Sequence, residues 1–301
     1  MNHTAPATAP ADAPEQEHLT IGSDALSVRV DPRGARIASI VDCLTSTEFL
    51  LVTPWADEVW DPVPLSQGSS TEWHRRYPGG WHTLVPHSGD ERSVGGVEHP
   101  FHGEASWRIW RLVDAGPSSC THEVVLRTVP LRVRRSVRID GGTVRVTQTV
   151  TNLSPDAVSF TWTEHPALGP AVVGPRSRVI VAGEDAGVQF PRDEGGVGGF
   201  RSLEVSGPGD AEIIDPDTGA FVRLRWDTDL MPHLHLWQEH HATDGFPWWR
   251  SVNTIALEPA SRAYWPEDDQ LGPVVVAGRG SVTGEFALEA GFTAEGAGRR
   301  R

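Results

Sequence analysis

Apolar and polar residues alternate with a period of two along much of the chain, and such alternation predicts half-buried strands. In residues 137–150, Val137 and Ile139 lead into Asp140-Gly141-Gly142, and alternating valines follow. A Gly-Gly pair between two alternating runs predicts a tight hairpin. No stretch keeps apolar residues at helical spacing for three turns. We therefore expect an all-β fold, a large antiparallel β-sandwich with few short helices.

The length of 301 residues and a hydrophobic content of 38% fit one β domain with a substantial core. Residues 1–18 are rich in Ala, Pro, Thr and Glu, which predicts a disordered N-terminal tail. Residues 295–301 predict a C-terminal tail, and no linker interrupts the chain between the two tails. We expect residues 19–294 to form a single β-sandwich catalytic domain.

The charge balance excludes several classes of function. The formal net charge is -14, which disfavours binding to nucleic acid because both surfaces repel each other. All 26 basic residues are arginine. Without lysine, the chain has no Schiff-base nucleophile, no anchor for pyridoxal phosphate and no P-loop.

Cys43 and Cys120 are the only cysteines, too few for a disulfide framework or a cysteine zinc site, and we expect them to be reduced. The N-terminal residues contain no apolar run long enough for a signal peptide or a membrane span. These features predict a cytoplasmic protein without a membrane partner, and they leave the oligomeric state open.

Histidine and tryptophan gather in four segments, and the chain has 12 Trp against 2 Tyr. Indole faces stack on the C–H faces of sugar rings, while the indole N–H can bond a hydroxyl. The segments therefore indicate a carbohydrate site, although most single tryptophans in such a fold fill its core. They span residues 73–89, 99–110, 160–169 and 233–249.

Two acid–base candidates stand directly before prolines. His165 precedes Pro166 in FTWTEHPALG, and Glu258 precedes Pro259 in NTIALEPAS. Because proline cannot donate a ladder hydrogen bond, we expect His165 to stand at the end of a strand, aimed beyond the sheet.

Three segments together resemble a known family. HPFHGEASWR, EHPALG and ALEPAS, in this order, resemble the aldose 1-epimerase (galactose mutarotase-like) superfamily, and the PGGW segment is similar to its divergent bacterial branches. The likeness covers most of residues 19–290. It implies a β-sandwich enzyme, an isomerase that interconverts the α and β anomers of a sugar without a cofactor.

The resemblance also implies roles for individual residues. His165 matches the general acid that protonates the ring oxygen, and Glu258 matches the general base that removes the anomeric proton. His102 matches a histidine that binds near the ring oxygen. Arg76 is similar in position to a substrate-binding arginine.

The chemistry of sugar binding adds four further expectations. Trp81, Trp107 and Trp237 are candidate stacking platforms, and Gln238 is a candidate hydroxyl partner. Hexose, pentose, sulfosugar and sugar phosphate all remain open as the small-molecule substrate.

Three other functions compete with the epimerase. His233, His235 and Glu239 resemble the first motif of the cupin metal site, with both histidines on one face of a strand. A second alternative is a carbohydrate-binding protein without catalytic activity, which the sequence does not exclude. A glycosidase would use Glu164 and Glu258 as a carboxylate pair across one cleft.

Overall fold

The computed structural model describes residues 18–58, 68–191, 196–265, 270–294 and 296. The predicted tails, 1–18 and 295–301, lie outside the described residues except for His18 and Gly296. No helix within these described ranges is both long enough and apolar enough to cross a membrane.

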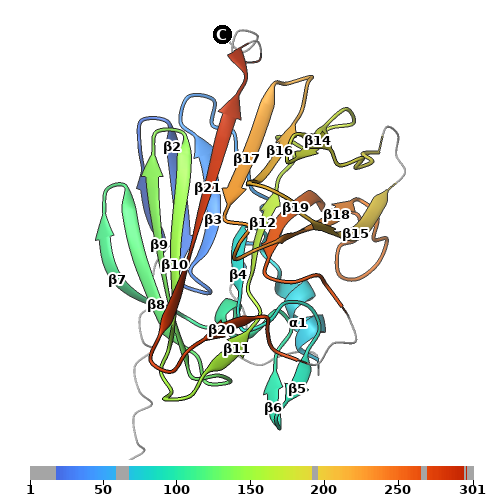
Figure 1. Ribbon diagram of the computed structural model, residues 1–301. Helices are drawn as coiled ribbons and strands as arrows, with labels where there is room; N and C mark the ends of the chain where they lie inside the picture. Colours follow the sequence, from blue (N-terminus) through green and yellow to red (C-terminus); the bar gives the residue numbers. More distant parts are fainter. Residues whose placement is uncertain (1–17, 59–67, 192–195, 266–269, 295, 297–301) are drawn as a thin grey trace, which may run out of the picture.

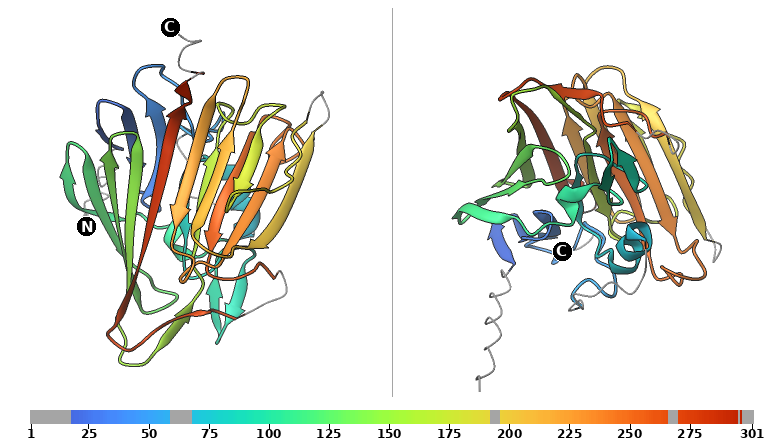
Figure 2. Two further views of the ribbon diagram at one scale, coloured as in Figure 1. Left: turned by 45° about the horizontal axis from the view of Figure 1, so that its top comes forward. Right: turned by 90° about the horizontal axis from the view of Figure 1, so that it is seen from below.

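In this part of the chain, two antiparallel sheets form the layers of a β-sandwich (Figures 1 and 2), which confirms the predicted fold class. In spatial order, the eight-stranded sheet contains β1 (Leu19–Gly22), β2 (Leu26–Asp31), β3 (Arg36–Asp42), β4 (Trp81–Leu84), β12 (Thr163–Leu168), β19 (Asn253–Ala260), β18 (His233–His240) and β15 (Val197–Glu204). The nine-stranded sheet contains β14 (Glu184–Asp185), β13 (Arg178–Val181), β16 (Gly209–Ile214), β17 (Ala220–Trp226), β21 (Ser281–Phe292), β10 (Thr143–Asn152), β9 (Leu131–Asp140), β8 (Ser119–Val125) and β7 (Arg111–Gly116).

Short elements complete the described fold. They are two small paired sheets, β5 (Arg92–Val94) with β6 (Val97–His99) and β11 (Val158–Phe160) with β20 (Val274–Val276), together with helix α1 (Ser69–Arg76) and the 3₁₀ turn η1 (Glu104–Ser106).

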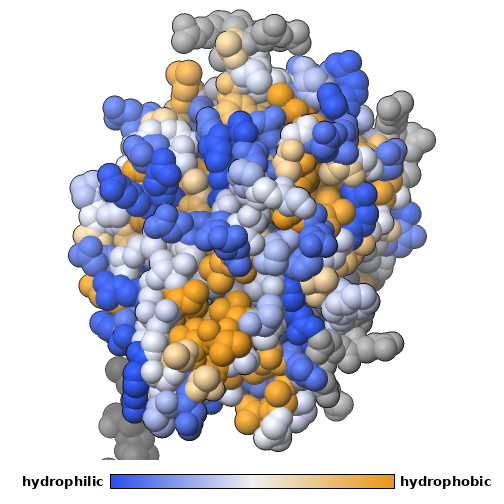
Figure 3. All heavy atoms as spheres, viewed as in Figure 1, coloured by the Kyte–Doolittle hydropathy of each residue, from blue (hydrophilic) through white to orange (hydrophobic). Residues whose placement is uncertain are grey.

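The hairpin predicted at Gly141-Gly142 is confirmed. Asp140 at the end of β9 pairs with Thr143 at the start of β10, so the two glycines form the turn. Gly141 has a φ of 57°, which glycine adopts without a steric penalty. Alternate residues of both strands are buried, and the others are polar and face solvent. Figure 3 shows polar side chains over much of this outer face of the nine-stranded sheet.

The eight-stranded sheet is covered on both faces. One face packs against the nine-stranded sheet in the main core, to which Leu168 and Leu257 belong. Ala167 and Ala256 lie on the other face, in a second apolar cluster that we name the outer cluster. It also contains Leu51, Trp73, Tyr77, Leu84, Phe101, Trp248 and Val252. Every residue of β12 is consequently buried.

A buried polar network joins the two sheets. The guanidinium of Arg135 on β9 donates to both carboxylate oxygens of Glu164 on β12, at 2.8 and 3.0 Å, and both side chains are fully buried. Glu164 also accepts the indole N–H groups of Trp81 and Trp162, at 2.6 and 2.9 Å. Gln148 accepts a further bond from Arg135 at 2.9 Å. Trp81 thus lies between the sheets, which is incompatible with the stacking role expected for it.

Breaking this ion pair will destabilise the fold. Arg135→Met leaves Glu164 buried without its cation, and we expect the free energy of unfolding to fall by about 3–5 kcal/mol. Adding Glu164→Gln to Arg135→Met removes the stranded charge and will restore part of the loss. Urea denaturation followed by fluorescence measures both effects.

The control is Arg178→Met, which breaks a largely exposed pair with Asp185. Its cost should be about 0–1 kcal/mol. Equal costs for Arg135→Met and Arg178→Met would contradict a structural role for the buried pair.

Candidate active site

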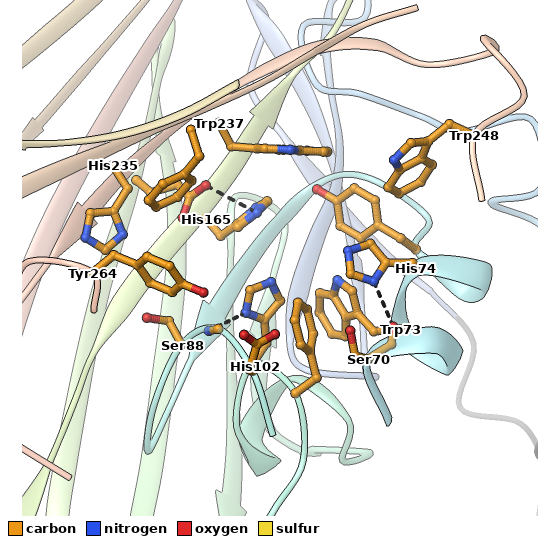
Figure 4. A pocket seen from close by; sticks show the side chains of 16 residues that line it. Ser70, Trp73, His74, Ser88, His102, His165, His235, Trp237, Trp248 and Tyr264 are labelled. Carbon is orange, nitrogen blue, oxygen red and sulfur yellow. Dashed lines mark hydrogen bonds and ion pairs between the residues drawn. The ribbon is translucent and has the colours of Figure 1, made fainter. Parts of the chain in front are cut away.

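A cavity of about 340 Å³ opens on the outer-cluster side of the eight-stranded sheet. Its lining includes four histidines and two carboxyl groups, namely His74, His102, His165, His235, Asp90 and Glu258. Its aromatic walls are Trp73, Tyr77, Phe101, Phe200, Trp237, Trp248 and Tyr264 (Figure 4). Ser70, Ser88 and Gly89 complete the lining.

Strand register brings the central residues into one row. His235 on β18 pairs with Glu258 on β19. On the other side of β19, Thr163 pairs with Ala260 and Ala167 with Ala256, which sets His165 of β12 level with Glu258. Because side chains alternate along a strand, Glu164 points into the core while His165 points into the cavity. This row includes the predicted acid–base pair.

The expectation that His165 ends its strand is wrong. Pro166 lies inside β12, and Pro259 lies inside β19. In the pairing of β12 with β19, residues 164–166 form no ladder pairs with residues 257–259. Proline has no N–H to donate, which accounts for a gap in the ladder at Pro166 and Pro259. Each strand continues because its other edge is paired, His165 with His82 and Pro259 with Leu234.

His165 and Glu258 form a close buried pair. Nε2 of His165 lies 3.4 Å from Oε1 of Glu258, and each side chain is at most 6% exposed. Burial lowers the pKa of His165 to about 4 and raises the pKa of Glu258 well above that of an ordinary carboxyl. Both shifts disfavour charge, so burial favours the neutral form of the pair, with one proton on Glu258. Moving that proton to His165 leaves the net charge of the pair unchanged.

His102 is fixed as a hydrogen-bond donor. Its Nδ1 accepts the backbone N–H of Gly89 at 3.0 Å, so in the neutral ring the proton sits on Nε2. Burial holds the pKa of His102 well below its usual value, which keeps the ring neutral. The ring centroids of His102 and His165 are 5.7 Å apart.

The histidines at the two sides of the cavity have their tautomers fixed by carbonyls. His74 donates Nδ1–H to the carbonyl of Ser70 at 2.8 Å, and His235 donates Nε2–H to the carbonyl of Arg262 at 3.1 Å. Burial lowers the pKa of both rings, that of His235 to about 4. Each therefore offers its second nitrogen as an acceptor, so the cavity holds both donors and acceptors suited to hydroxyl groups.

Trp237 is the one predicted platform that lines the cavity, and its ring lies 5.8 Å from that of His165. The sequence did not single out Trp73, Tyr77 or Trp248, although all three belong to the segments rich in histidine and tryptophan. Trp73 and Tyr77 come from α1 and its C-cap, and Trp248 comes from the loop after β18.

Three other predicted binding residues lie outside the cavity lining. Arg76 forms an ion pair with Glu72 on α1, with 2.7 Å between Nε and Oε2. Trp107 donates its indole N–H to the carbonyl of Phe101 at 2.8 Å. Its ring packs against that of Trp73, so Trp107 supports a wall of the cavity from outside the lining. Gln238 alternates with Trp237 and so faces away, with its amide bonded to the carbonyl of Gln189.

The alternatives find less support in this geometry. Within the described ranges, no three His, Cys, Asp or Glu side chains converge as a metal site. The cupin-like set is His233, His235 and Glu239. Glu239 accepts backbone N–H groups of the loop that follows β18, and His235 donates to the carbonyl of Arg262, so both side chains have partners other than a metal. Glu164 cannot pair with Glu258 across a cleft because it lies in the core.

No protein-family model matches the sequence, and no curated protein matches it either. Solved structures do match. A galactose mutarotase related enzyme from Lactobacillus acidophilus has a TM-score of 0.70 at 14% identity, covering 92% of this chain and 98% of that one. A galactose mutarotase-like protein from Lactobacillus casei has a TM-score of 0.65 at 15% identity, covering 91% and 100%.

An aldose epimerase homologue from C. elegans matches equally well, with a TM-score of 0.65 at 12% identity, covering 92% of this chain and 99% of that one. The similarity extends over almost the whole length of each structure. Sequence identities this low establish a shared fold and nothing about activity. The chain therefore has the fold of the aldose 1-epimerase (galactose mutarotase-like) superfamily, as the resemblance in its sequence implied.

Proposed function

We propose that this protein is an aldose 1-epimerase that interconverts the α and β anomers of a sugar. The observation that carries the proposal is the contact between His165 and Glu258, 3.4 Å apart in a buried cavity with aromatic walls. An acid and a base within reach of one small molecule are sufficient for ring opening of a hemiacetal. The proposed residue roles are those implied by the sequence resemblance.

The reaction needs two proton transfers. Glu258 accepts the proton of the anomeric hydroxyl while His165 donates a proton to the ring oxygen, and the bond between C1 and the ring oxygen breaks. The product is the open-chain aldehyde, which rotates about its C1–C2 bond. Reclosure returns both protons by the reverse transfers, so the enzyme is unchanged and no electrons are exchanged.

A single proton shared between His165 and Glu258 suits this cycle. The ion-paired form, with the proton on His165, is the form that opens the ring. The neutral form, with the proton on Glu258, is the state left after ring opening. One proton moved across the 3.4 Å contact interconverts them, so burial of the pair need not block either direction.

The neutral cavity histidines would orient the sugar. The Nε2–H of His102 is a donor, while His74 and His235 each present an acceptor nitrogen. Sugar hydroxyls both donate and accept, and Trp237 and Trp248 offer stacking faces. We propose His102, Trp237 and these additional groups as the substrate-binding set.

The parent protein should accelerate the mutarotation of a freshly dissolved aldose, followed by polarimetry. His165→Asn and Glu258→Gln keep the approximate side-chain volume and remove the acid or the base, so each should lower kcat by about 10²–10⁴-fold. His233→Asn is the control, because His233 lies on β18 outside the cavity lining. Sugar binding without any acceleration by the parent would instead identify a non-catalytic carbohydrate-binding protein.

The pH profile should differ from that of an ordinary histidine enzyme. Below about pH 4 the pair gains a second proton and loses its base, because burial lowers the pKa of His165 to about 4. Activity should fall on the alkaline side only at a pH well above the usual carboxyl pKa, because burial raises the pKa of Glu258. We expect kcat/KM to show no acid limb between pH 5 and pH 7 after subtraction of the spontaneous rate. An acid limb centred near the ordinary histidine pKa would contradict this assignment.

A further inference from the structure

Tyr77 carries a buried hydroxyl that nothing in the described structure satisfies. The residue is 2% exposed and lines the cavity, and its phenolic oxygen has no hydrogen-bond partner among the described residues. Leaving a buried hydroxyl unsatisfied costs about 1–3 kcal/mol. Such a group calls for a partner that enters the cavity.

Contacts to the ring and to the main chain of Tyr77 fix the position of its hydroxyl. The Tyr77 ring packs against Trp73 at 5.8 Å and against Trp248 at 5.9 Å between centroids. The Tyr77 carbonyl accepts hydrogen bonds from the hydroxyl of Thr53 at 3.0 Å and from the indole of Trp55 at 2.9 Å. The position of the phenol is therefore fixed before any ligand binds, which is what a preorganised donor requires.

The Tyr77 ring lies beside the acid–base pair. The ring lies 5.9 Å from that of His165 and 6.0 Å from that of Trp237. Burial, and after it the charge of Glu258, raises the pKa of Tyr77 well above its usual value. The raised pKa keeps the phenol protonated at neutral pH, so it remains a hydrogen-bond donor there.

We infer that the Tyr77 hydroxyl donates a hydrogen bond to the anomeric oxygen of the bound sugar, the atom that Glu258 deprotonates. This inference rests on the proposed epimerase function. Negative charge grows on the anomeric oxygen as its proton leaves, so a fixed donor there binds the transition state more strongly than the ground state.

The test is Tyr77→Phe, which keeps the packed ring and removes only the hydroxyl. We expect kcat to fall by about 10²-fold, the usual effect of removing one such donor, with little change in KM. The Tm of the sugar-free variant should be equal to or higher than that of the parent, because an unsatisfied polar group is lost.

Thr254→Val is the matched control. Its hydroxyl is also buried, but it is bonded to the carbonyl of Leu168 at 2.7 Å and lies outside the cavity lining. This variant should show the opposite pattern, a lower Tm with kcat close to that of the parent. Lower activity together with higher or unchanged Tm is therefore specific for a hydroxyl that acts on the substrate.

Two results would overturn the inference. One is a Tyr77→Phe enzyme whose kcat stays within about threefold of the parent. The other is a fall in Tm that accompanies a raised KM at unchanged kcat, which would identify a packing role. If the parent itself fails to accelerate mutarotation, the proposed function fails and the inference fails with it. An active parent, an inactive Glu258→Gln variant and a fully active Tyr77→Phe variant would refute the Tyr77 role alone.

Discussion

The ion pair between Arg135 and Glu164 is the interaction on which the candidate site depends. It anchors β12 to the opposite sheet at the residue directly before His165. Since neighbouring side chains on a strand point to opposite faces, fixing Glu164 in the core fixes the direction of His165. The indoles of Trp81 and Trp162 complete the anchor and prevent the carboxylate from turning toward the cavity.

On the cavity side of the same sheet, burial determines which groups carry charge. It disfavours charge on His165 and Glu258 alike, while main-chain groups fix the tautomers of His74, His102 and His235. The histidines of the cavity are thus neutral donors and acceptors around the buried pair of His165 and Glu258. This arrangement favours chemistry in which protons move and net charge does not change.

The fold could be predicted from the sequence because alternation and the Gly141-Gly142 turn are local signals. His102, His165 and Glu258 were found through motifs and do line the cavity. Trp81 and Trp237 carry the same local signal, yet one lies between the sheets and the other in the cavity. That difference depends on which face of a strand meets the second sheet, a long-range property.

Tyr77 illustrates the same limit. It lies in a segment that its histidines and tryptophans had already marked, but only the completed packing reveals that its hydroxyl lacks a partner. Arg76, its neighbour, was the more obvious candidate and is instead paired with Glu72 along the helix. A charged side chain is conspicuous in a sequence, whereas an unsatisfied one becomes visible only in three dimensions.

The two prolines in β12 and β19 give the sheet an unusual mechanical property. Residues 164–166 and 257–259 form no ladder pairs with each other, although both strands are held firmly along their other edges. Moving His165 and Glu258 apart therefore breaks no hydrogen bond between β12 and β19 at that point. The gap in pairing therefore allows the two strands to separate locally at the acid–base pair, while their other edges stay hydrogen-bonded to β4 and β18.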